Sequence, residues 1–161
     1  MKVNVPRGFY VALSVSAVAA IILLSYLLVS ARDIPECSAN LRTSRVTPAG
    51  MVESNIYVNI VRSGWNRAII ALNGRAYRDG KKKAIARILE GKYKYNRGYY
   101  YITIEKSIRQ PMDNFSSEDA QAFFLGVNKQ YYALKIAKLD DDNFIMYYGK
   151  LPELLCAVTR K

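Results

Sequence analysis

Two cysteines, Cys37 and Cys156, are the residues of this sequence most suited to chemistry, because the chain contains no histidine. Histidine is the usual general base and the commonest metal ligand, and a cysteine nucleophile normally needs one beside it. The two thiols are too far apart for a CxxC redox centre, and two thiols alone do not make a zinc site. We therefore expect a protein that is not an enzyme, with no catalytic residue, cofactor or metal.

The acidic run Asp140, Asp141 and Asp142 is the other candidate for chemistry, since carboxylates in series can bind calcium. Its spacing is not that of an EF-hand loop. We predict a polar turn between two strands instead.

We predict a disulfide between Cys37 and Cys156. The number of cysteines is even, and the apolar segment described next indicates that the chain is exported to a compartment where disulfides persist. The disulfide would join the start of the exported part to its end, and two buried free thiols are the alternative.

An apolar segment explains why the chain should be exported. Phe9 to Ala31 carries no charged residue and is long enough as a helix to cross a hydrocarbon core of about 30 Å. We interpret it as a transmembrane helix, with Lys2 and Arg7 favouring a cytoplasmic N-terminus. A cleaved signal peptide is the alternative, because Val29-Ser30-Ala31 resembles a cleavage site, although the apolar run is longer than is typical.

Small residues recur at four-residue spacing within this segment, at Ala12, Ser16 and Ala20. This spacing permits close approach of a second helix, and we predict a candidate membrane helix contact there.

The net charge of +11 belongs almost entirely to the part that follows residue 31. A basic domain beside a membrane could contact anionic lipid or an acidic partner, while export argues against nucleic acid. A basic surface that maintains solubility is the simpler alternative.

The exported part reads as a connector followed by strands. Residues 32–50 contain Pro35 and Pro48 and show no periodicity, so the predicted organisation is a cytoplasmic start (1–8), a transmembrane helix (9–31), a connector (32–50) and a periplasmic β-rich domain (51–161). Ile56, Val58 and Ile60 share one strand face by period two, as do Tyr100, Ile102 and Ile104.

Turn signals separate the predicted strands. Asp79-Gly80 suits a two-residue hairpin, Asn96 to Gly98 suits a second turn, and Asn73-Gly74 is either a bulge or an early turn. The segment "FSSEDAQAFFLG" predicts one helix with Ser116 as its N-cap. The expected fold is therefore α+β: a mainly antiparallel curled sheet, barrel or half-barrel with one covering helix.

Tyrosines gather between Lys92 and Tyr101. Tyrosine combines apolar area with a polar tip and favours interfaces, although it is also a good strand former. The candidate partner interface consists of Tyr93, Tyr95, Tyr99 and Tyr101.

Five features of the chain together form a recognisable layout: the anchor, Cys37 soon after it, "YRDGKKKAIARI", "KIAKLDDDNFIMY" and Cys156 in "LPELLCAV". This layout resembles small periplasmic accessory proteins of membrane-bound transcription regulators, the ToxS, FidL and PsaF/MyfF type, and is most similar to MyfF/PsaF. The resemblance extends over nearly the whole chain as layout, without a sharp motif.

This resemblance implies a β-rich periplasmic barrel or half-barrel, a place in a bacterial inner membrane, and a partner. The partner would be a membrane-anchored winged-helix transcription regulator, whose periplasmic domain the protein binds and stabilises. The regulator's targets would be fimbrial or virulence genes, and the protein could convey an envelope signal to it.

Two other functions remain open from the sequence. One is an inner-membrane structural component of a pilus or secretion assembly, and the other is a periplasmic binding module for a small amphipathic molecule. If the protein senses pH near 6, carboxylates with raised pKa values would have to act, because histidine is absent. The candidates are Glu53, Glu90, Glu105, Asp113 and Glu153.

Overall fold

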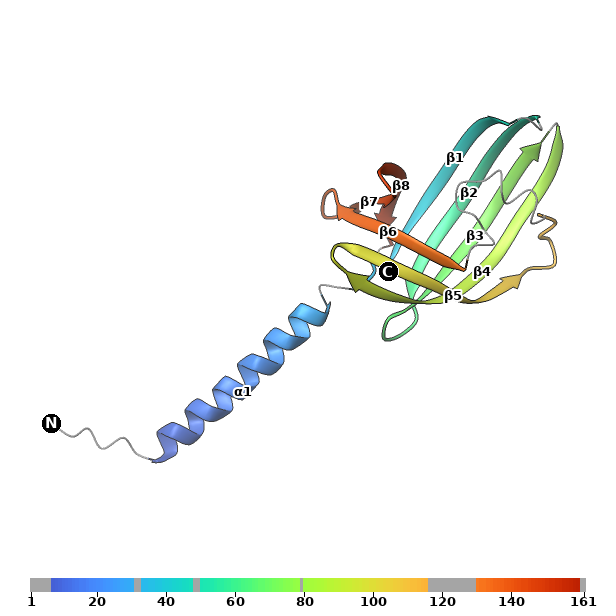
Figure 1. Cartoon of the computed structure of the whole chain (residues 1–161). Helices are drawn as coiled ribbons and strands as arrows, with labels where there is room; N and C mark the ends of the chain where they lie inside the picture. Colours follow the sequence, from blue (N-terminus) through green and yellow to red (C-terminus); the bar gives the residue numbers. More distant parts are fainter. Residues whose placement is uncertain (1–6, 31–32, 48–49, 79, 116–129, 160–161) are drawn as a thin grey trace. The chain divides into compact units, whose positions relative to one another are not determined.

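The computed structural model describes residues 7–30, 33–47, 50–78, 80–115 and 130–159 as one helix and eight strands (Figure 1). The chain divides into two compact units, Met1–Asp33 and Ile34–Lys161. The first unit contains the helix, and the second contains all the described strands.

Helix α1 (Arg7–Ser30) forms the described part of the first unit. Its stretch Gly8–Tyr26 is long and apolar enough to cross a membrane, and its side chains are exposed along the whole stretch. A helix that presents apolar side chains on every side suits lipid better than water. The predicted apolar helix is thus confirmed, although a signal sequence would meet the same criteria of length and composition.

The second unit is a closed, antiparallel barrel of eight strands in sequence order (Figure 1). The strands are β1 (Cys37–Thr47), β2 (Gly50–Arg62), β3 (Arg67–Arg78), β4 (Lys81–Asn96), β5 (Tyr99–Arg109), β6 (Tyr131–Lys138), β7 (Asn143–Tyr148) and β8 (Leu151–Val158). Each strand pairs with the next, and β8 returns to β1. This confirms the expected helix followed by a mainly antiparallel β domain.

The barrel interior is filled by alternate residues of its strands, as a period of two requires. Ile56, Val58 and Ile60 of β2 are all buried, and so are Tyr100 and Ile102 of β5. The two predicted strand faces are therefore confirmed.

The turns follow the sequence signals at two of three places. Gly80, at φ 74°, lies between β3 and β4, and Arg97 and Gly98 turn the chain between β4 and β5 with φ of 49° and 86°. Asn73 and Gly74 form neither a bulge nor a turn, because both pair inside β3. A Cβ on Gly74 would lie 2.7 Å from the Cα of Ile56, so this glycine permits close packing of β3 on β2.

The predicted connector at 32–50 is wrong, because β1 occupies most of it and pairs along its whole length with β2. Its inward residues Cys37, Ala39 and Leu41 do alternate, but two of them are small, and polar side chains lie between them. The alternation of apolar and polar residues in β1 is too weak to indicate a strand by itself. Its pairing with β2, whose alternation is strong, stabilises β1 as a strand. The predicted helix with Ser116 as its N-cap lies, from residue 116 onward, outside the described residues.

Candidate functional site

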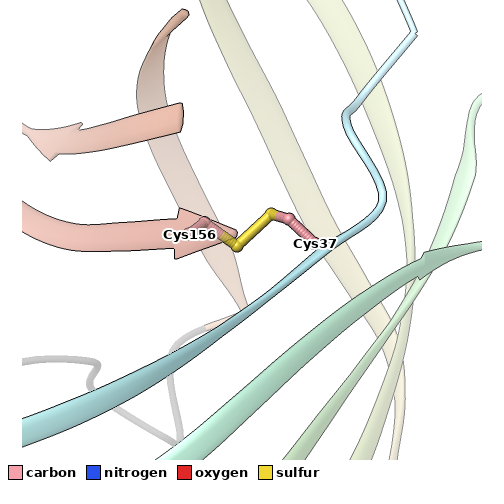
Figure 2. The surroundings of a disulfide bond; sticks show 2 residues. All are labelled: Cys37 and Cys156. Atoms are coloured by element: carbon pink, nitrogen blue, oxygen red, sulfur yellow. A yellow bond between two sulfur atoms is a disulfide. The ribbon is translucent and has the colours of Figure 1, made fainter. Parts of the chain in front are cut away.

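A disulfide closes the barrel. Cys37 begins β1 and Cys156 lies near the end of β8, with their Cα atoms 5.5 Å apart (Figure 2). Both side chains are fully buried. Between the described parts of these strands only Cys37 with Val158 and Ser38 with Ala157 are paired, so the disulfide joins the shortest seam of the barrel. The predicted bond is confirmed, and it fixes the seam as well as the ends of the domain.

Beyond this seam, the outer edge of β1 over residues 39–47 is not paired with any of the described strands. The other edge of β1 is fully paired with β2. An edge strand with unpaired backbone groups is a template for a further strand.

A buried cluster of charged side chains lies at β4, which is three strands away from β1 in the barrel. The Arg87 guanidinium donates to both oxygens of Asp113, from Nε at 2.7 Å and from Nη2 at 3.3 Å. The side chains of Arg87 and Asp113 are only 4% and 0% exposed. Arg109 adds a second guanidinium at 3.2 Å from Asp113 Oδ1.

This cluster holds residues 110–115 against β4. Arg87 and Arg109 both donate to the carbonyl oxygen of Phe115, each at 2.5 Å, and the Phe115 side chain is fully buried. Asp113 and Asn114 accept hydrogen bonds from the backbone of Ala86 and Ala84, so they cap the edge of β4 that lies beyond its pairing with β5.

The electrostatics of Asp113 follow from this geometry. Burial opposes its charged form, but hydrogen bonds from Arg87, from the Ala86 and Phe115 backbone, and from Arg109 outweigh burial, so its pKa lies below the ordinary value. The pKa of Glu105 is also lowered, chiefly by its hydrogen bond from Lys92. Neither carboxyl has the raised pKa that titration near pH 6 would need.

The sequence did not single out Arg87 as part of a site. Its position in β4, between Ile85 and Leu89, gives one signal that could have indicated it: inward-facing residues alternate there, so an arginine on that face must be paired. Which carboxylate pairs with it depends on how the chain folds back after β5, and no local pattern encodes that.

The barrel contains a small apolar cavity of about 60 Å³. Leu72, Leu89 and Ile102 are among the aliphatic side chains that line it. The lining residues that carry polar side-chain atoms are Tyr132, Tyr147, Tyr148 and Glu153. Burial, with a smaller contribution from Tyr148, raises the pKa of Tyr132 to about 12, so its hydroxyl remains protonated at physiological pH.

The four predicted interface tyrosines lie on two faces of the sheet. Tyr93 is 4% exposed, and its ring lies 6.1 Å from that of Tyr100 inside the barrel. Tyr95 is more exposed and also packs on Tyr100, at 5.0 Å. Tyr99 and Tyr101 point outward, where a third tyrosine, Tyr131, packs on Tyr101 at 6.1 Å. The interface stays a prediction, and its exposed members are Tyr95, Tyr99 and the partly exposed Tyr101.

The remaining candidates have simple surroundings. Ala12, Ser16 and Ala20 are exposed on α1, and the Ser16 hydroxyl donates to the Leu13 carbonyl, so the helix contact stays a prediction. The residues between β6 and β7 form a polar turn, in which Asp140 accepts from Asn143 and Asp141 pairs with Lys138. Among the described residues, no group of three or more His, Cys, Asp or Glu could hold a metal ion.

No protein-family model matches the chain, and no curated protein matches it.

Proposed function

We propose that this protein is a non-catalytic, single-pass accessory protein of a bacterial inner membrane. Its barrel would lie in the periplasm, where it binds and stabilises the periplasmic domain of a membrane-anchored transcription regulator of fimbrial or virulence genes. The observation that supports the proposal most is the outer edge of β1 at residues 39–47, with which no strand in the described part of the chain pairs, next to a seam of two residue pairs. The membrane-compatible helix and the resemblance in layout agree with it.

Strand addition supplies the mechanism. A strand from the regulator that pairs with β1 gains main-chain hydrogen bonds, and the neighbouring side chains of the barrel provide selectivity. A partner that binds only the folded regulator shifts the regulator away from unfolding and proteolysis.

Deleting the gene for this protein should lower the steady-state level of the regulator and the transcription of its targets. Immunoblotting and transcript measurement would test this. Unchanged levels of both would contradict the proposal.

Photo-crosslinking in intact cells tests the edge directly. A crosslinker at Asn40 or Ser44, both exposed on β1, should capture the regulator, whereas one at Asn73, exposed in the middle of β3, should not. Capture of pilus or secretion subunits from the β1 positions would favour a structural role in such an assembly and contradict the accessory role.

The apolar cavity favours one other function, the binding of a small amphipathic molecule. At about 60 Å³ it is smaller than an engineered cavity of about 150 Å³ that accepts benzene, so a larger ligand would have to part the barrel wall. A thermal-shift screen with bile acids and fatty acids tests this function. A rise in Tm with a member of either class would support it, and no shift with any of them would exclude those classes.

The anchor has its own test. Alkaline extraction of membranes should leave the full-length chain in the pellet, with an intact N-terminus by sequencing, because Gly8–Tyr26 remains in the bilayer. Release of a chain that begins after Ala31 would instead identify a cleaved signal peptide.

A further inference from the structure

A second surface of the barrel is independent of the β1 edge. It lies at the end of the barrel where β1 begins, referred to below as the Cys37 end. The strand register places the β2–β3 turn and the β4–β5 turn at the same end. The single tryptophan of the chain, Trp65, is in the first of these turns and is 79% exposed.

The turn that carries Trp65 is firmly built. The Ser63 N–H donates to the Arg67 carbonyl at 3.1 Å, and the carbonyl of Asn66 accepts from the Tyr93 N–H of β4 at 2.8 Å. Gly64 and Asn66 adopt positive φ, of 128° and 52°. The braced turn thus holds a large, exposed aromatic ring at this end of the barrel, where it is available for a contact outside the domain.

Aromatic and basic side chains also lie on the outer face of β4, β5 and β6, close to the same end of the barrel. Tyr99 and Tyr101 point outward because Tyr100 and Ile102 fill the interior, and the strand register sets Lys94 beside Tyr101 and Lys135 beside Tyr99. Tyr131 extends the group and is 54% exposed. The Trp65 surface consists of Trp65, Lys94, Tyr99, Tyr101, Tyr131 and Lys135.

Charges around this surface are asymmetric. On the β3 side, Arg67 and Lys92 share Glu105, at 3.5 Å and 2.5 Å, which neutralises part of their charge. On the other side, the acidic turn of Asp140, Asp141 and Asp142 marks its limit, and Asp141 is paired there with Lys138. Between these limits the surface carries Lys94 and Lys135 among the aromatic rings.

We infer that the Trp65 surface docks on the headgroup region of an anionic lipid bilayer. Tryptophan and tyrosine concentrate at membrane interfaces, where the ring meets the acyl boundary and the polar atom stays hydrated. Lysines beside them attract anionic headgroups and can extend toward them.

The short segment between α1 and β1 favours lipid as the partner of the Trp65 surface. Residues 31–36 join Ser30 of α1 to Cys37 of β1, and these seven steps of about 3.5 Å each reach no more than about 25 Å. If α1 spans the bilayer, this tether keeps the Cys37 end within reach of the membrane surface, at a high effective lipid concentration. The inference requires α1 in the membrane, but it does not require the regulator.

Trp65 makes the test direct, because all tryptophan emission comes from this position. The full-length chain, with its disulfide confirmed by mass, is reconstituted in vesicles of phosphatidylcholine and phosphatidylglycerol. A matched preparation contains the same lipids brominated near the headgroup. In the mixed vesicles we expect Trp65 emission to be blue-shifted and to lose most of its intensity when the lipid is brominated. Bromine should quench Trp65 less in vesicles of phosphatidylcholine alone, or in the mixed vesicles at high salt, because both conditions weaken attraction to anionic headgroups.

Two variants complete the experiment. In Trp65→Phe with Val46→Trp, the tryptophan moves to a position 86% exposed at the other end of β1, and its emission should not be quenched. In Lys94→Gln with Lys135→Gln, Trp65 stays and quenching should weaken.

Water-exposed, unquenched emission of Trp65 from chains that float with the vesicles would overturn the inference. Equal quenching at Trp65 and at the position 46 probe would also overturn it, because it would report a general collapse of the domain onto lipid. Emission that is shielded only in native membranes, and not in purified vesicles, would assign the surface to a protein partner and overturn lipid docking as well.

Discussion

Among single residues, Asp113 joins the most groups of the buried cluster of charged side chains. It accepts from two guanidinium groups and two backbone N–H groups, and its side chain is fully buried. Removing two charges from water is costly, and their mutual attraction compensates only when the geometry satisfies both partners. Asp113 thus allows the charged Arg87 to lie among the mostly apolar buried residues of the barrel.

Replacing Asp113 with asparagine should lower the free energy of unfolding by about 3–5 kcal/mol, because it leaves the Arg87 charge buried without its counter-ion. Denaturant unfolding of the full-length chain in detergent measures this. The matched control is Asp141→Asn, whose side chain is 97% exposed beside Lys138 and should change stability by less than about 1 kcal/mol. Equal effects of the two variants would contradict the role assigned to Asp113.

The pH dependence of this contribution follows from its sign. The pKa of Asp113 is lower in the folded state than in the unfolded chain, where an aspartate has a pKa of about 3.9. The stabilisation is therefore complete above that value and is lost as the pH falls through the folded-state pKa. Unfolding measured against pH should show a constant difference between wild type and Asp113→Asn from about pH 5 to 8, and convergence in strong acid. A difference that disappears near pH 6 would contradict this assignment.

Among the elements, β4 organises the barrel. It is the longest strand, pairs with β3 and β5, and has its remaining edge capped by Asp113 and Asn114. The β4–β5 register shifts between Glu90 and Gly91, so Glu105 is the extra residue of a bulge. A bulge increases the local twist, which helps a sheet to close. Gly91 allows the approach, because a Cβ there would lie 2.6 Å from the Thr103 carbonyl oxygen.

Gly91→Ala should therefore destabilise the barrel by about 1–3 kcal/mol, the usual cost of overpacking. Thermal unfolding of the detergent-solubilised chain measures it, and Lys81→Ala, at the exposed start of β4, is the control. An unchanged Tm for Gly91→Ala would show that β5 can move away without cost.

At this same scale, local patterns predicted most strands and missed one. Some signals involve only a few adjacent residues and can be recognised without knowing the fold. These are the alternation of apolar and polar residues in β2 and β5, and the glycines at the β3–β4 and β4–β5 turns. The strand β1 is different: Ala39 is small, Leu41 is flanked by polar residues, and its partner strand supplies the rest. The Arg87–Asp113 pair and the position of the bulge depend on contacts between segments far apart, which periodicity does not report.

At the scale of the whole molecule, the barrel is closed between β8 and β1 by a short ladder and a disulfide. Within the described residues, two residue pairs, one disulfide and a hydrogen bond from the Thr159 N–H to the Glu36 carbonyl join the end of β8 to the start of β1, whereas β1 is paired with β2 along its entire length. A crosslink that spans 119 residues also restricts the unfolded chain, and on the chain-entropy model this is worth about 4–5 kcal/mol.

Cys37→Ser combined with Cys156→Ser should lower the free energy of unfolding by up to this amount. Hydrogen exchange should accelerate first in β1 and β8, before the β2–β3–β4 core. Wild-type protein under reducing conditions provides the control, since it should match the double variant. Unchanged stability together with uniform exchange would contradict the role of the seam.

The position of the disulfide also sets an order of events during biogenesis. In the proposed topology Cys37 would enter the oxidising compartment early, whereas its partner Cys156 lies in β8, which follows the other described strands in the chain. Until β8 arrives, β1 to β5 can form only an open sheet with two exposed edges, a state that other strands can join. In that topology the disulfide would form only after β8 has been exported, and until then the domain would be accessible to oxidoreductases and to chaperones that cover strand edges.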